Sequence, residues 1–199
     1  MDEVKGFVLA GGRSSRMRQD KALMRLHGKP LVLHAAEILQ PFVIELAILG
    51  PKDRYGDFGL PVLEDRWPGQ GPLGAVCTGL LSSSAPWNIF LACDLPRLTP
   101  PFVQLLIKRM RSTRSAAVVP RTEDGWQPLC AAYHSRCAVL FERAFLEGKR
   151  SISGCLDALD AEAITQDEMK AAGLRDGELA NVNTPEDWER FAPRSADGR

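Results

Sequence analysis

The stretch GFVLAGGRSSRMRQDK, residues 6–21, indicates the fold class of this chain of 199 residues. Residues 6–10 are apolar or glycine and predict a buried strand, and the glycines that follow predict a tight turn. The turn leads into a loop whose cations include Arg16 and Lys21. Open α/β sheets bind ligands where strands end, and backbone N–H groups beside cations suit a phosphate. The stretch therefore predicts a phosphate-binding loop after the first strand of an α/β sheet.

Two common nucleotide-binding motifs are absent from this loop. A Walker-type loop, GxxxxGK[ST], needs glycine before Lys21 and a hydroxyl after it, whereas the chain has Asp20 and Ala22. A dinucleotide fingerprint needs GxGxxG and an acid after the second strand, which here ends at Gly50-Pro51. An NAD-dependent oxidoreductase is therefore disfavoured. The glycines alone would also fit an ordinary turn that binds nothing.

Strand-like apolar runs alternate with segments of helical periodicity, as in a mostly parallel sheet with helices on both faces. The expected strands are 6–10, 42–49, 61–63, 88–92, 116–119, 127–133 and 178–182, of which 127–133 could run antiparallel. The expected helices are 31–39, 72–81, 100–110, 135–147 and 151–159, with another beginning at Pro185. We expect one doubly wound α/β domain over residues 1–191 and a disordered tail over 192–199.

Composition and charge do not favour nucleic acid or a membrane as the partner of this chain. The 25 Lys and Arg residues balance 25 Asp and Glu residues, so no net field favours nucleic acid or a membrane surface. No apolar run reaches the length of about 18 residues that spans a bilayer. The first five residues lack the basic and then apolar form of a signal peptide. We therefore expect a cytoplasmic protein that acts on small molecules.

The cysteines are expected to be buried free thiols. They are odd in number, form no CxxC pair and lie mostly in apolar segments, so neither a disulfide framework nor a zinc site is indicated. They are Cys77, Cys93, Cys130, Cys137 and Cys155. A catalytic pair of cysteine and histidine stays open as an alternative, although the spacing of the three histidines does not indicate one.

Two further motifs follow predicted strands. Asp65 precedes a glycine-rich turn, residues 69–74, that leads into a helix N-terminus, where unpaired N–H groups favour anions. Asp94 comes directly after an apolar strand, where a carboxylate is costly unless it is paired. Mg²⁺, bound through one or two carboxylates and substrate phosphates, is a suitable partner. The alternatives are a plain turn and an aspartate that bonds to its own backbone.

The last motif contains two asparagines, Asn181 and Asn183. Their alternate spacing would put both on one face of a strand, and their amides need partners if they are buried. We interpret Thr184, Pro185 and Asp187 as the capped start of a helix. In a doubly wound sheet, all these motifs would meet along one edge.

At these residues the chain resembles the molybdenum cofactor guanylyltransferases, the protein A family of molybdopterin-guanine dinucleotide biosynthesis. The matching motifs are Leu9 to Gly12, Arg16-Met17, Asp20-Lys21, Gly71 to Gly74, Cys93 to Pro96, Pro128-Leu129 and Asn181 to Asp187. They occur in family order across nearly the whole chain. The first motif is shared with other nucleotidyltransferases, and the combination is more specific. The resemblance implies a Rossmann-like nucleotidyltransferase fold.

The resemblance also implies roles for individual residues. The nucleotide would lie along Leu9, Ala10, Gly11 and Gly12, and its phosphates would contact Lys21 and Arg16. The nucleoside would lie near Asp65 and Gly71, and Mg²⁺ would be bound by Asp94. The pterin would lie near Asn181 and Asn183. Lys21, Arg16 and Asp94 would be the catalytic residues. Two positions depart from the family pattern, namely Arg18, where glycine is usual, and Gly50, where many members have an asparagine that contacts the nucleoside.

The implied reaction is transfer of GMP from Mg·GTP to the terminal phosphate of molybdopterin, with release of pyrophosphate. A phosphate monoester has a second pKa of about 6 and is mostly dianionic at neutral pH, so no protein base is required. Cytidylyl transfer to the same pterin and transfer to another small phosphate stay open, as does a non-catalytic module that delivers nucleotide or cofactor. Transient contact with molybdoenzymes or their chaperones is also expected.

Overall fold

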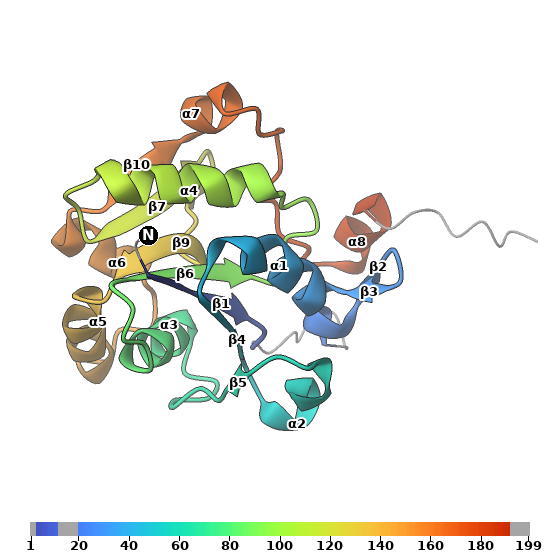
Figure 1. Cartoon of the computed structure of the whole chain (residues 1–199), viewed down its shortest axis with the longest axis horizontal. Coiled ribbons are helices and arrows are strands. Elements are labelled where there is room, and N and C mark those ends of the chain that lie inside the picture. Colours follow the sequence, from blue (N-terminus) through green and yellow to red (C-terminus); the bar gives the residue numbers. More distant parts are fainter. Residues whose placement is uncertain (1–2, 12–19, 192–199) are drawn as a thin grey trace, which may run out of the picture.

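The computed structural model describes residues 3–11 and 20–191, and a mixed β-sheet lies between two layers of helices (Figure 1). The strand order is β10-β7-β9-β6-β1-β4-β5, and the short β8 pairs with β7. The strands are β1 Val4–Leu9, β4 Glu45–Leu49, β5 Val62–Leu63, β6 Trp87–Ala92, β7 Ala117–Thr122, β8 Gly125–Trp126, β9 Cys130–His134 and β10 Glu162–Thr165. Strand β9 runs antiparallel to β6 and β7, while β5, β4, β1 and β6 pair in parallel, as do β7 and β10. The predicted α/β class with a mostly parallel sheet is confirmed.

Helices cover both faces of the sheet, because successive strand residues point to opposite sides and both sets are apolar. In β1, Val4 and Val8 pack with α1 and α4, whereas Phe7 and Leu9 pack with α3 and α5 (Figure 1). The longer helices are α1 Leu31–Leu39, α3 Pro72–Leu81, α4 Pro100–Ser112 and α5 Cys137–Leu146. The shorter ones are α2 Lys52–Tyr55, α6 Ser153–Leu156, α7 Gln166–Ala171 and α8 Pro185–Phe191.

Most predicted elements are confirmed, with shifted ends. The second predicted strand, 42–49, begins only at Glu45, because Gln40–Phe42 forms the short 3₁₀ helix η2. The predicted helix 151–159 is α6 followed by the 3₁₀ helix η4, Asp157–Leu159. The predicted strand 178–182 is wrong, since these residues form turns and irregular backbone. Hydrogen bonds to the Glu178 side chain hold this segment, and it pairs with no sheet strand.

Several short elements are absent from the sequence prediction. The hairpin of β2, Arg25–Leu26, and β3, Lys29–Pro30, contains only two residues in each strand, too few to show an alternating pattern. Helices α2 and α7 and strands β8 and β10 are also short. The hairpin lies beside α8 (Figure 1), and a small third core joins them through Met24, Leu26, Leu31, Val182 and Trp188.

Within the described ranges, no helix is long and apolar enough to cross a membrane. Three of the residues singled out in the sequence, Gly12, Arg16 and Arg18, lie outside the described residues, as does the tail 192–199.

Candidate functional site

Four parallel strands end in one row at the same edge of the sheet. Leu9 of β1 is in register with Leu49 of β4 and with Ala92 of β6, and Leu49 is in register with Leu63 of β5. Neighbouring strands lie about 4.8 Å apart, so the row spans about 14 Å from β5 to β6. The segments with Asp65, Gly50, Gly11 and Asp94 therefore leave the sheet side by side, as the sequence predicts.

Lys21 connects two of the motifs that are far apart in the sequence. Its Nζ donates to Asn183 Oδ1 over 2.8 Å and lies 3.5 Å from Asp94 Oδ2. The side chains of Lys21 and Asp94 are 16% and 21% exposed, so solvent reaches both but screens their charges only in part. An ammonium, a carboxylate and an amide therefore converge at the ends of β1 and β6.

The position of Asp94 disfavours the ionised form of its carboxyl group. Burial raises the pKa of its carboxyl group, and the neighbouring Lys21 ammonium opposes that rise. The backbone around it is fixed, because Cys93 N donates to Leu9 O over 3.2 Å and Val182 N donates to Asp94 O over 3.0 Å. The second bond places the segment with Asn181 and Asn183 beside the end of β6.

Asp20 holds the turn that carries Lys21. Its Oδ1 accepts from Ala22 N over 3.0 Å and so caps the 3₁₀ helix η1, Lys21–Leu23. Its Oδ2 accepts from the Tyr55 hydroxyl over 2.9 Å and from Arg54 Nη1 over 3.2 Å. Burial raises the pKa of Tyr55, which is 1% exposed, so the hydroxyl stays protonated and can donate. No sequence signal marks Tyr55, because it lies in the short helix α2, 35 positions after Asp20.

The packing of Tyr55 accounts for Gly50, which departs from the family pattern. A Cβ atom on residue 50 would lie 2.7 Å from Tyr55 Cε2 and 2.9 Å from the Ala10 carbonyl oxygen. Real Cβ atoms do not approach that closely, and the carbonyl oxygen belongs to the backbone beside β1. The tyrosine ring thus occupies space that a side chain at residue 50 would need.

The predicted nucleoside side of the site contains structural contacts. Asp65 Oδ1 accepts from Thr78 Oγ1 over 2.9 Å and from Trp67 N over 3.0 Å, which ties the loop to helix α3. Gly71 precedes α3 with a φ of +97°, a conformation that favours glycine. The first turn of α3 is partly capped, because Leu73 N donates to the Arg150 carbonyl over 3.1 Å. These contacts are the ones expected of a structural turn, which is the alternative interpretation of the motif at Asp65 and residues 69–74.

The segment before α8 is held by two acidic side chains. Glu178 is 6% exposed and accepts from Thr99 N over 3.1 Å, from the Thr99 hydroxyl, and from Arg175 N over 3.2 Å. Asp187 accepts from the backbone N–H groups of Asn183 and Thr184, and its own N–H donates to Thr184 Oγ1 over 3.1 Å. The capping interpretation of Thr184 is confirmed. No local sequence signal marks Glu178, since its main partner lies 79 positions away.

Asn181 and Asn183 are both exposed and belong to no strand, so the expectation that a strand aligns them is wrong. Asn183 has the Lys21 ammonium as its partner.

The cysteines are confirmed as buried free thiols. Burial raises the pKa of Cys77 to about 11 and that of Cys137 to about 12, and it also raises the pKa values of the other three. A thiolate nucleophile needs a lowered pKa. The thiols therefore have the character of core residues.

Known proteins are similar to this chain in sequence and in fold. A family model described as "MobA-like NTP transferase domain" matches residues 6–163. A "probable molybdenum cofactor guanylyltransferase" of Synechococcus elongatus is 35% identical over 191 residues, which cover 92% of this chain and 95% of that protein. The molybdenum cofactor guanylyltransferase of Serratia proteamaculans is 31% identical over 196 residues, covering 96% of this chain and 94% of that protein. The structure of molybdopterin-guanine dinucleotide biosynthesis protein A from Archaeoglobus fulgidus superposes with a TM-score of 0.82 at 24% identity, covers 94% of this chain and 96% of that one, and so shows the same fold.

Proposed function

The chain belongs to the family of MobA-like NTP transferase domains, and we propose that it transfers GMP from Mg·GTP to the terminal phosphate of molybdopterin. The similarity to molybdenum cofactor guanylyltransferases over more than nine-tenths of the chain supports this reaction. The observation that carries it within the structure is the position of Lys21, between Asp94 and Asn183.

The reaction needs little covalent chemistry from the protein. An oxygen of the acceptor phosphate attacks the α-phosphorus of GTP, and the bond from that phosphorus to the bridging oxygen of the β-phosphate breaks. Pyrophosphate leaves with the electron pair. Because the acceptor phosphate is mostly dianionic at neutral pH, no base has to remove a proton. The protein must hold two polyanions together and offset the charge that develops on the leaving group.

Lys21 supplies a cation for this purpose. Its ammonium already neighbours a carboxylate and an amide oxygen, so it lies where phosphate oxygens would meet the ends of β1 and β6. A cation aimed at the leaving pyrophosphate acts more strongly in the transition state than in the ground state. Arg16 is proposed to contribute a second cation from the same loop.

The residues around Asp94 fit a magnesium ion. Mg²⁺ takes one or two carboxylates and completes its shell with substrate phosphates and water. No group of three or more potential metal ligands occurs in residues 3–11 and 20–191, so Asp94 would share the ion with substrate. The carboxyl group of Asp94 is desolvated, and a divalent cation would favour its ionised form. When bound, Mg²⁺ would neutralise charge on the phosphates during transfer.

The nucleoside is proposed to lie over β4 and β5. Leu9, Ala10, Gly11 and Gly12 would follow the nucleotide, with Asp65 and Gly71 near the base and ribose. Gly71 is exposed and leaves its backbone accessible at that end of the row. A site built to pair with one base edge leaves buried groups unpaired with another base, which costs about 1 to 3 kcal/mol for each lost partner. The similarity to guanylyltransferases indicates guanine as that base, so we expect GTP to be preferred over CTP and ATP.

Product identification tests this function. Purified protein is incubated with Mg²⁺, molybdopterin and an equimolar mixture of GTP, CTP and ATP, and the dinucleotide formed is identified by mass. The guanine dinucleotide and an equal amount of pyrophosphate are expected. A cytosine dinucleotide in equal or greater amount would refute the guanylyl assignment, and the absence of any dinucleotide would refute transfer altogether.

The product would then pass to a molybdoenzyme or its chaperone by transient contact. We place this step in the cytoplasm, where five free thiols remain reduced.

A further inference from the structure

The carboxyl edge of the sheet continues beyond the row that ends at β6. Ala92 N donates to Leu129 O over 2.8 Å, so the start of β9 lies beside the end of β6. Strands β7 and β10 are parallel and end at Thr122 and Thr165 on that edge. This second half of the edge is covered by the β7–β8 turn, helix α7 and the segment 174–180.

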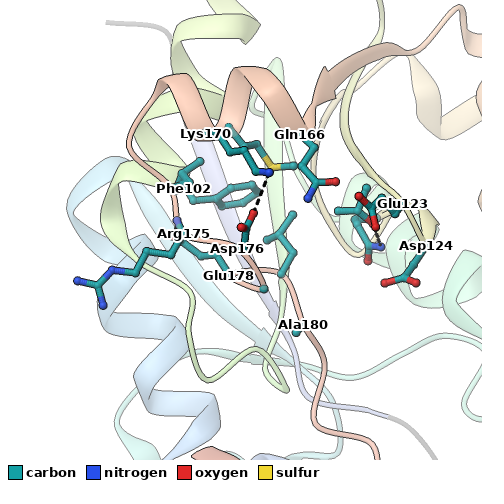
Figure 2. A pocket seen from close by; sticks show the side chains of 15 residues that line it. Phe102, Glu123, Asp124, Gln166, Lys170, Arg175, Asp176, Glu178 and Ala180 are labelled. Atoms are coloured by element: carbon teal, nitrogen blue, oxygen red, sulfur yellow. Dashed lines mark hydrogen bonds and ion pairs between the residues drawn. The ribbon is translucent and has the colours of Figure 1, made fainter.

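A cavity of 140 Å³ opens between these elements (Figure 2). Each water molecule needs about 10–15 Å³ of such space, so the cavity holds roughly ten. That room suits a flat ring system of two rings and is too small for a nucleotide. Four buried apolar side chains form its walls, namely Phe102, Met169, Leu174 and Leu179.

The rim of the cavity is polar and mostly acidic. Glu123 and Asp124, both exposed, and the half-buried Gln166 lie along one side (Figure 2). Gln127 also lines it and donates to Thr122 Oγ1 over 3.0 Å. Two cations also line it. Lys170 Nζ lies 3.2 Å from Asp176 Oδ1, and the Arg175 guanidinium points away from Glu123 and Asp124 (Figure 2). This rim suits hydrogen-bond donors on a neutral ligand and disfavours phosphate.

The cavity is connected to the reaction centre by the backbone. Leu179 and Ala180 line it, and the next residues are Asn181 and Val182, whose N–H donates to Asp94 O. A ligand with a ring in the cavity therefore needs only a short arm to bring a phosphate to Lys21 and Asn183. Strands β6 and β10 are three spacings apart, about 14 Å, which sets the scale of such a ligand.

We propose that this cavity binds the pterin ring of the acceptor, with the amino and ring N–H edge of the pterin facing Glu123 and Asp124. The inference rests on the proposed function, since it places the acceptor of that reaction. A pterin is flat and neutral, and it carries adjacent donors that match a carboxylate. The apolar walls contact its faces, and the amides of Gln127 and Gln166 complete the polar edge.

Binding of free pterin tests the assignment without any transfer step. Pterin is fluorescent, so its quenching or anisotropy can be titrated with protein alone. We expect saturable binding to the wild-type protein and at least about tenfold weaker binding to the double variant Glu123→Gln with Asp124→Asn, because two charged acceptors are lost. Gln166→Ala, on the neighbouring helix, should weaken binding severalfold.

The matched control is Asp167→Asn, which removes an exposed acid next to Gln166 that does not line the cavity. Its pterin affinity should equal that of the wild type. Equal affinity of the wild type and the double variant would overturn the inference. So would displacement of pterin by inorganic phosphate, which would indicate an anion site.

The two proposals fail in different ways. A wild-type protein that forms the guanine dinucleotide, with pterin affinity unaffected by the rim variants, would refute this inference and leave the function standing. A wild-type protein whose pterin binding depends on the rim, but which forms no dinucleotide, would refute the function and leave the cavity assignment standing.

Discussion

The two halves of the carboxyl edge differ in how the chain builds them. Over β5, β1 and β6, Asp65, Gly11 and Asp94 each stand two positions after a strand end, and the register of the strands brings these ends into one row with the end of β4. Over β9, β7 and β10, the cavity is lined by a turn, a helix and a loop from three separate parts of the chain. The strand-end residues of the first half are marked by local sequence, and Lys21 is held there by contacts with the distant Asn183 and Asp94. The second half depends on long-range contacts throughout. We expect the first half to bind GTP and carry out the transfer, and the second half to bind the acceptor.

Among the variants that test this division of the edge, removing the charge of Asp94 should lower the rate of transfer most. Asp94→Asn should lower kcat at least about 100-fold, a change of about 2.7 kcal/mol in the barrier, because the phosphates lose their metal carboxylate. Steady-state release of pyrophosphate measures this loss. If the variant keeps more than about a tenth of the wild-type rate, Asp94 is not the principal metal ligand.

The same variant should be more stable at neutral pH. The pKa of Asp94 is raised in the folded protein, so its favourable contribution exists at low pH and is lost as pH rises through that pKa. The asparagine side chain of the variant stays neutral at every pH. The Tm of Asp94→Asn should therefore exceed that of the wild type at pH 7, and the gap should narrow as pH falls and Asp94 is protonated. A gap that widens on acidification would contradict the assigned burial.

Lys21→Ala should have the next largest effect. We expect kcat/KM for GTP to fall about 50-fold, with a lower kcat as well as a higher KM, since the cation acts on charge that develops during transfer. Initial rates at varied GTP measure both parameters. An unchanged kcat with a raised KM would show that Lys21 only binds the nucleotide.

Tyr55→Phe should lower kcat about tenfold, because Asp20 loses a donor and the turn that carries Lys21 loosens. The chain offers a matched control, Tyr133→Phe, which also removes a hydroxyl from a fully buried ring, here one that donates to the Pro128 carbonyl over 2.7 Å. The Tm of both variants should fall, and only Tyr55→Phe should lose rate.

A double-mutant cycle shows whether Tyr55 acts through Lys21. In the Lys21→Ala background, Tyr55→Phe should cause little further loss. Amide hydrogen exchange at Ala22, whose N–H donates to Asp20, should be faster in Tyr55→Phe whatever the activity. Additive losses with unchanged exchange at Ala22 would refute the positioning role.

Glu178→Gln should have the smallest effect, and it addresses the second half of the edge. The carboxylate holds the 174–180 segment to the start of α4, and glutamine keeps its shape but not its charge. We expect the KM for molybdopterin to rise about threefold to fivefold, with the KM for GTP unchanged. If only the KM for GTP rises, the second half of the edge binds the nucleotide and the assignment of the two halves is wrong.

In both halves, the sequence could predict what local signals mark and could not predict contacts between distant residues. The position of Asp94 at the end of β6 and that of Lys21 in the loop after β1 follow from apolar runs and turn residues, which are local signals. The contacts of Tyr55 with Asp20 and of Glu178 with Thr99 join residues 35 and 79 positions apart, and nothing local marks them. The strand expected at 178–182 failed for this reason, because side-chain contacts to a distant helix override its apolar residues.

The most direct test of the divided edge compares both KM values in two variants. Asp65→Ala removes the acceptor that ties the loop after β5 to Thr78, and Asp124→Asn removes a charge from the rim of the cavity. We expect Asp65→Ala to raise only the KM for GTP and Asp124→Asn to raise only the KM for molybdopterin, each at least about fivefold. If both variants raise both KM values to the same extent, the edge is not divided between nucleotide and acceptor.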